Sequence, residues 1–135
     1  MNNKKLGSSF EQELADKLYE YGFWVHLLNA NKAGQPADIV AVKNKVAHLI
    51  DAKVCTNGVF PLSRVEENQD MAMTLWKECG NGEGWFAFKV ADEVYMMPHY
   101  TIMICKDIQS SLSATEIKVL GKSLESWVKW VNRCK

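Results

Sequence analysis

Residues 36–54 read PADIVAVKNKVAHLIDAKV, and this stretch decides the fold. It contains two runs rich in strand-forming residues, 37–43 and 46–54, which are separated only by Asn44 and Lys45. Two such runs joined by two residues predict a β-hairpin. Apolar residues occur at both odd and even positions of each run, so both faces of the hairpin are expected to be buried. The sequence therefore predicts a sheet with helices on both of its faces.

Hydrophobic periodicity and turn residues place further elements around this hairpin. Helices are predicted over 9–21, 62–79 and 124–133, and strands over 23–28, 85–90 and 94–97. Two further runs, 100–104 and 117–120, resemble short strands. The expected fold class is α/β, with a central mixed β-sheet flanked by helices and an α-β-β-β-α-β core. The 135 residues are expected to form a single domain, with a core over about 5–98 and a C-terminal helical extension over about 122–134.

Charge and composition exclude several classes of protein. Sixteen basic and sixteen acidic residues give a formal net charge of zero, which argues against nucleic-acid binding through bulk charge alone. Residues 1–64 nevertheless hold eight basic and six acidic residues, so a local basic face remains open. No apolar run is long enough to span a bilayer, and the N-terminus lacks the apolar segment of a secretory signal. We therefore expect a cytoplasmic protein without a membrane partner. The four cysteines lack zinc-site spacing and are expected to be reduced thiols.

The hairpin also brings charged residues together. A two-residue turn pairs positions whose numbers sum to 89, which places Asp38 directly opposite Asp51, with Lys53 on the same face. Two opposed carboxylates destabilise a buried sheet, and a divalent cation such as Mg²⁺ removes the conflict. The alternative is that Asp38 merely ends its strand while Asp51 and Lys53 face solvent. Together, an acid, a facing acid and a lysine within otherwise apolar strands favour a functional site.

These residues resemble a known motif. PADIVAV followed by HLIDAKV resembles the core of the PD-(D/E)XK nuclease superfamily, with Pro36 and Asp38 as its first half and residues 51–53 as its second. The preceding GSSFEQELADKLYEYGFWV is similar to the opening helix of archaeal-type Holliday junction resolvases, where Glu11 takes the position of the helical glutamate. Gln69 resembles the glutamine that follows the lysine motif in RecU-like and VRR-type nucleases. The resemblance covers about residues 5–90, and residues 100–135 add nothing to it.

The resemblance implies a restriction-endonuclease-like fold and metal-assisted phosphodiester hydrolysis. It implies that Glu11, Asp38 and Asp51 hold Mg²⁺, with Mn²⁺ as a substitute, near the scissile phosphate. Lys53 would orient or deprotonate the attacking water or stabilise charge on the phosphate, and the nearby carboxylates favour the electrostatic role. Gln69 would position phosphate or water from the covering helix.

Some of these residues have structural explanations as well. Glu11 lies three residues after Ser8, so it also fits a capping box, and Gln69 also fits a helix surface. Basic residues of the first half are candidates for DNA contact, although they also fit a solvated surface: Lys4, Lys5, Lys32 and Arg64.

The favoured hypothesis is a Mg²⁺-dependent, structure-specific endonuclease for branched or duplex DNA, with a Holliday junction resolvase first. Such an enzyme is expected to be a homodimer, because a four-way junction is cut symmetrically on two strands and each chain has one site. The alternatives are a VRR-type flap nuclease, a restriction-like nuclease, or a catalytically silent module that binds DNA or protein.

Overall fold

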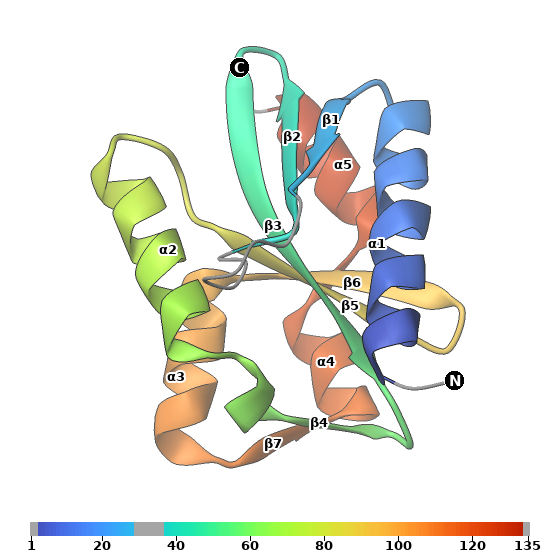
Figure 1. The fold of residues 1–135 in the computed structure, drawn as a ribbon, viewed down its shortest axis with the longest axis vertical. Coiled ribbons are helices and arrows are strands. Elements are labelled where there is room, and N and C mark those ends of the chain that lie inside the picture. The colour runs from blue at the N-terminus through green and yellow to red at the C-terminus, as the bar shows by residue number, and fades with distance from the viewer. Residues whose placement is uncertain (1–2, 29–36, 134–135) are drawn as a thin grey trace.

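The computed structural model describes residues 3–28 and 37–133 of the chain, and it has the expected α/β architecture (Figure 1). Within these ranges there are five α-helices: α1 (Asn3–Glu20), α2 (Glu67–Glu78), α3 (His99–Ile108), α4 (Ala114–Leu120) and α5 (Leu124–Arg133). The same ranges contain one 3-10 helix, η1 (Leu62–Arg64). The strands are β1 (Trp24–Leu27), β2 (Ile39–Lys43), β3 (Val46–Cys55), β4 (Val59–Pro61), β5 (Trp85–Val90), β6 (Glu93–Pro98), β7 (Ser111–Ser113) and β8 (Lys122–Ser123).

Six strands form the central sheet in the order β1-β2-β3-β5-β6-β8. Strands β3 and β5 run parallel, and the other neighbouring pairs are antiparallel. The central sheet is therefore mixed, as predicted. A small second sheet pairs β4 with β7 beside the main one.

The β2–β3 hairpin has the predicted register. Its turn residues, Asn44 and Lys45, have φ values of 53° and 69°. Two left-handed residues in succession are what a tight two-residue hairpin turn requires. Ile39 pairs with Ile50 and Lys43 with Val46, so paired residue numbers sum to 89 along the whole hairpin.

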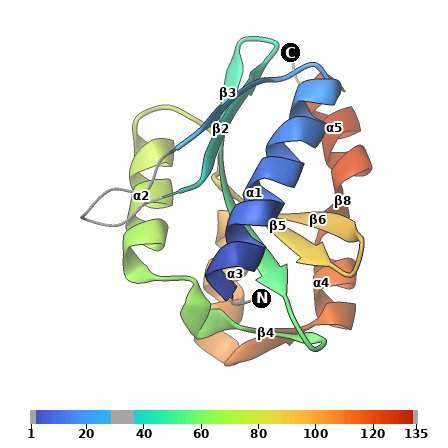
Figure 2. The same cartoon turned by 45° about the vertical axis from the view of Figure 1, so that its right-hand side comes forward.

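Helices cover both faces of the sheet, and each face has its own hydrophobic core. Helices α1 and α5 pack on one face, where Leu14 and Trp127 are fully buried and Trp127 stacks on Phe23 with ring centroids 5.6 Å apart. On the other face, Met73 of α2 and Ile102 of α3 pack against inward-facing residues of the sheet. Figure 2 shows α1 and α5 together on one side of the molecule and α2 on the opposite side. The prediction of a sheet buried on both faces is confirmed.

The first helix begins earlier than predicted. Helix α1 starts at Asn3, so Ser8 lies inside it and cannot be its N-cap. A capping residue must have non-helical backbone angles at the helix boundary. The capping-box interpretation of Ser8 and Glu11 is therefore wrong.

The predicted helix over 62–79 is shorter in the structure. Leu62–Arg64 form a 3-10 turn, Val65 is extended, and α2 begins only at Glu67. Leu62 and Val65 are both buried, and their spacing of three residues suits a 3-10 turn as well as an α-helix. Hydrophobic periodicity alone could not distinguish the two.

The strand-like runs at 100–104 and 117–120 are helical instead. Ile102 and Cys105 of α3 are buried while Ile104 is exposed, which is the pattern of one buried helix face. In α4, Ile117 is buried and Val119 is exposed. The β-branched residues suggested strands, but packing against the sheet favours helices here. In the described part of the chain, no helix combines the length and apolarity needed to cross a bilayer.

Candidate active site

Asp38 lies directly before β2 and close to Asp51, whose pKa its charge raises. The strand pairing of the hairpin ends at Ile39 and Ile50, and the Asp38 amide donates a 3.1 Å hydrogen bond to the Ile50 carbonyl just beyond it. One carboxylate oxygen of Asp38 accepts a 2.7 Å hydrogen bond from the Ala52 amide. The Asp38 side chain is therefore tied across to the strand that carries Asp51 and Lys53.

Asp51 is the most deeply buried acid of this group, with 1% of its surface exposed. Its Oδ2 lies 3.0 Å from Lys53 Nζ, and the two groups form an ion pair. Burial raises the pKa of Asp51 well above its usual range, the charge of Asp38 raises it further, and the charge of Lys53 partly offsets both effects. A buried carboxylate that is paired with one cation in the described part of the chain is a strong candidate for binding a further cation.

Glu11 reaches this group from α1. The pKa of Glu11 is raised to about 7, mainly by burial. A side-chain hydrogen bond with Asp38 and the charge of Asp38 raise it further, while the charge of Lys53 lowers it. Glu11 of α1 and the acids of the hairpin region, which lie on either side of β1 in the sequence, thus come together. The structure brings together the predicted Glu11, Asp38, Asp51 and Lys53.

Gln69 also lies at this position, on the first turn of α2. Its Oε1 accepts hydrogen bonds from Lys53 Nζ at 3.0 Å and from the Glu66 amide at 3.1 Å. Its Nε2 lies 3.5 Å from an oxygen of Asp51, the longest of these contacts. Lys53 Nζ donates a further 3.0 Å bond to the Arg64 carbonyl. The segment before α2 and the first turn of α2 therefore both bind Lys53. Sequence analysis did not anticipate the contact with the Arg64 carbonyl.

Of the four residues predicted to contact DNA, the structure describes the side chain of Arg64. The Arg64 guanidinium donates a 3.1 Å bond to the Val54 carbonyl and lies 5.2 Å from the centre of the Phe60 ring. Lys32 and the side chains of Lys4 and Lys5 lie outside the described residues. DNA contact by these four basic residues stays a prediction.

The donor set suits a hard cation such as Mg²⁺. The carboxyl groups of Glu11 and Asp51 lie close to both Asp38 and Lys53, and Oδ2 of Asp51 is buried without a hydrogen bond from the described residues. Carboxylate oxygens are preferred ligands of Mg²⁺, which needs only one or two of them beside its waters. Among the described residues, no three His, Cys, Asp or Glu side chains form a ready-made metal cluster. Asp38 and Asp51 alone can therefore supply the carboxylates that the ion needs, with Glu11 beside Asp38 as a third carboxyl group.

Sequence analysis missed a second polar cluster behind Gln69. Asp70 contacts His99 Nε2 at 3.0 Å and Lys106 Nζ at 2.8 Å, both from α3. The partners are 29 and 36 residues from Asp70 along the chain. No local sequence pattern links residues so far apart, and only the place of Asp70 next to Gln69 pointed to this region.

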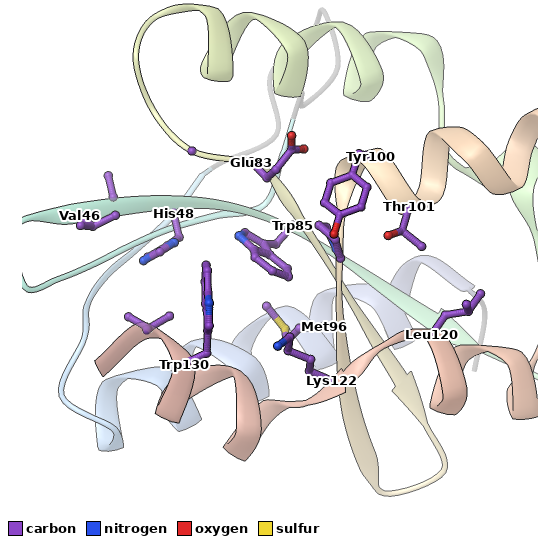
Figure 3. Close-up of a pocket in the computed structure, with 14 residues that line it drawn as sticks. Val46, His48, Glu83, Trp85, Met96, Tyr100, Thr101, Leu120, Lys122 and Trp130 are labelled. Atoms are coloured by element: carbon purple, nitrogen blue, oxygen red, sulfur yellow. The ribbon is translucent and has the colours of Figure 1, made fainter. Parts of the chain in front are cut away.

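A cavity of about 500 Å³ lies elsewhere on the molecule (Figure 3). Trp85 and Trp130 form part of its wall, with ring centroids 5.4 Å apart. His48 also lines it, from the beginning of β3. Trp85 belongs to the core that α1 and α5 cover, whereas α2 and its Gln69 lie over the other face of the sheet. None of the predicted site residues whose side chains are described lines this cavity.

Comparison with known proteins identifies the family. The family model described as archaeal Holliday junction resolvase (Hjc) matches residues 2–133. The match extends well past residue 90, so the expectation that residues 100–135 add nothing to the resemblance is wrong. Among curated proteins, no sequence matches this chain significantly.

Two solved structures are similar in fold. One is Hjc from Archaeoglobus fulgidus, a Holliday junction resolvase from an archaeal hyperthermophile, with a TM-score of 0.67, 20% identity, and coverage of 91% of this chain and 95% of that chain. The other is the bacterial homing endonuclease I-Ssp6803I, with a TM-score of 0.54, 16% identity, and coverage of 83% and 75%. The chain belongs to the archaeal Holliday junction resolvase family, and it is a structure-specific nuclease that acts on Holliday junctions.

Proposed function

We propose that the chain cuts junction strands by metal-assisted phosphodiester hydrolysis at the site around Asp51. In this proposal Glu11, Asp38 and Asp51 bind Mg²⁺, for which Mn²⁺ can substitute, and Lys53 acts on the scissile phosphate. The observation that carries it is the buried Asp51 carboxylate, which lies close to the charge of Asp38 and which, among the described residues, only Lys53 balances. Such an ion supplies a Lewis acid and a bound water of lowered pKa.

The protein side chains have distinct roles in this chemistry. Asp38 is fixed by its 2.7 Å bond from the Ala52 amide, so its second oxygen is directed by the sheet rather than by a flexible rotamer. Lys53 is held beside Asp51 and stabilises the negative charge that develops on the phosphate. Gln69 holds Lys53 through one atom of its amide and approaches Asp51 through the other. Gln69 thereby fixes the position of the Lys53 ammonium relative to the Asp51 carboxylate.

A cleavage assay on four substrates tests this function. The four-way junction, a flap, a linear duplex and a single strand are compared in Mg²⁺, in Mn²⁺ and in EDTA. We expect cleavage of the four-way junction in either metal and none in EDTA. Asp38→Asn should lose cleavage, while Asp16→Asn, on the exposed face of α1, should retain it. Cleavage that survives EDTA, or full activity of Asp38→Asn, would contradict the proposed chemistry.

Contact with DNA is proposed for the basic residues of the first half of the chain: Lys4, Lys5, Lys32 and Arg64. Arg64 uses one of its five N–H donors on the Val54 carbonyl, so the others remain for a phosphate. Neutralising a phosphate contact weakens binding for all sequences and reduces its salt dependence. Junction affinity of Arg64→Gln, measured at several salt concentrations, checks this role.

We also propose that the chain acts as a symmetric homodimer, since two strands of the junction must be cut and each chain has one site. The apolar surface that supports this lies on α2 and α3, which pack on each other and expose Leu75 (60%) and Ile104 (58%). Trp127 of α5 is fully buried in the core and leaves no area for such an interface.

Light scattering at micromolar concentration decides the assembly. The double variant Leu75→Ser/Ile104→Ser should be a monomer, because the two changes remove exposed apolar area from both helices of the proposed interface. Tyr19→Ser removes a still more exposed aromatic residue (74%) from α1 and should leave the dimer intact. A wild-type chain that scatters as a monomer would reject the proposed assembly.

A further inference from the structure

A partly buried polar cluster joins α2 to α3, and it plays no direct part in the chemistry proposed above. Its centre is the Asp70 carboxylate, which contacts His99 Nε2 through one oxygen and Lys106 Nζ through the other. The side chain of His99 is 8% exposed and that of Asp70 is 16% exposed. Groups this well shielded from water make directional contacts that are costly to break.

Lys106 binds the same short segment that holds Lys53. Lys53 Nζ donates to the Arg64 carbonyl and to Gln69 Oε1, each at 3.0 Å. Lys106 Nζ donates to the Val65 carbonyl at 2.9 Å and to Asp70 at 2.8 Å. Each residue bound by Lys106 directly follows a residue bound by Lys53. Segment 64–70 is therefore held at the same two places by both lysines.

Helix α3 is itself attached to the sheet that carries Lys53. The His99 amide donates a 2.8 Å bond to the Gly84 carbonyl, directly before β5. Strand β5 pairs in parallel with β3, and Phe88 lies opposite Lys53. The contacts thus form a closed loop: β3 contacts segment 64–70, this segment contacts α3, α3 contacts the start of β5, and β5 pairs with β3. A closed loop of this kind limits how far the Arg64 carbonyl and Gln69 can move.

We propose that Asp70, His99 and Lys106 are positioning residues, which fix segment 64–70 and thereby hold Lys53 at its distance from Asp51. The inference rests on the proposed function in one respect, namely that Lys53 is a catalytic residue. Displacement of a reacting group by about 1 Å can lower the rate roughly 100-fold, so residues that fix the position of Lys53 contribute to the rate of cleavage.

The test compares Lys106→Met with Lys118→Met, an exposed lysine on α4. Met keeps most of the aliphatic stem of Lys106 and removes its two hydrogen bonds. Cleavage of a four-way junction is measured in single turnover at saturating enzyme, well below the melting temperature of each variant. We expect Lys106→Met to slow cleavage at least tenfold with junction affinity changed less than threefold. Lys106→Arg should recover most of the rate, because arginine can donate to both acceptors.

A second measurement does not depend on activity. The side-chain amide resonances of Gln69 report its bonds to Lys53 and to the Glu66 amide. We expect these resonances to shift or broaden in Lys106→Met and to stay unchanged in Lys118→Met. If Lys106→Met does not fold, Asp70→Asn is measured by the same criteria.

The results separate this inference from the proposed function. An unchanged rate together with unchanged Gln69 resonances in a folded Lys106→Met overturns the positioning role. If Lys53→Met cleaves as fast as the wild type, the proposed function fails instead, and the Gln69 resonances alone decide whether the cluster positions segment 64–70.

Discussion

Lys53 Nζ lies 3.0 Å from Asp51 Oδ2, two residues along the same strand, and it is the only lysine paired with this carboxylate among the described residues. Side chains two positions apart on a strand point to the same face. The pair therefore follows directly from strand geometry. Because Asp38 opposes the same carboxylate, the charge of Asp51 is only partly compensated.

Replacing Asp51 by asparagine should separate stability from activity. The raised pKa of Asp51 shows that the fold disfavours its charge, so its removal should raise the melting temperature in metal-free buffer at neutral pH. The same change removes a proposed metal ligand and should lower cleavage by roughly 100-fold or more. Calorimetry and a junction cleavage assay check the two effects. Full cleavage by the folded variant would exclude Asp51 from the active site.

Glu11→Gln should reduce cleavage strongly without loss of stability. Ser8 lies inside α1, so Glu11 does not cap the helix, and burial of its carboxyl raises its pKa to about 7. Glu13→Gln is the matched control on the same helix, since Glu13 pairs with Lys89 at 2.8 Å. That variant should cleave normally and lose a little stability. Equal cleavage by both variants would place Glu11 outside the metal shell.

The free energy of unfolding should fall in mild acid because of His48. Burial lowers the pKa of His48 from 6.5 to about 4, so between these values the unfolded chain binds a proton that the folded chain does not. Stability is therefore lost as the pH falls through this window, by at most roughly 3 kcal/mol from this residue. His48→Phe, which keeps a ring against Trp127, should flatten the pH dependence. Urea unfolding at pH 7 and pH 5 measures the loss of unfolding free energy for the wild type and for His48→Phe. An equal loss in the two proteins would contradict the assignment to His48.

Gly84→Ala should destabilise the contact between α2 and the sheet. A Cβ at this position would lie 2.6 Å from both Cγ and Sδ of Met73, which is fully buried. The resulting strain should cost about 1–3 kcal/mol, as other overpacked cores do. Gly82→Ala adds a methyl group in open space and should change stability by less than about 0.5 kcal/mol. Thermal unfolding of the two variants provides the comparison, and equal melting temperatures would show that Met73 can move aside freely.

The amino-acid sequence by itself determined the hairpin and the pairing of its acids. A two-residue turn admits few geometries, so the positions of Asn44 and Lys45 set the register as far as Ile39 and Ile50, which brings Asp38 close to Asp51. Strand β5 and helix α5 also have the predicted bounds, because their turns and periodicity are local signals.

Tertiary structure decided what local patterns leave open. The β-branched residues of α3 and α4 suit strands in isolation, and only packing against the sheet makes these segments helical. The contact of Lys106 with Asp70 joins residues 36 positions apart, so no short stretch of sequence contains it. Which carbonyl and which amide hold Lys53 depends on how segment 64–70 packs against its face of the sheet, and no local sequence pattern sets that packing.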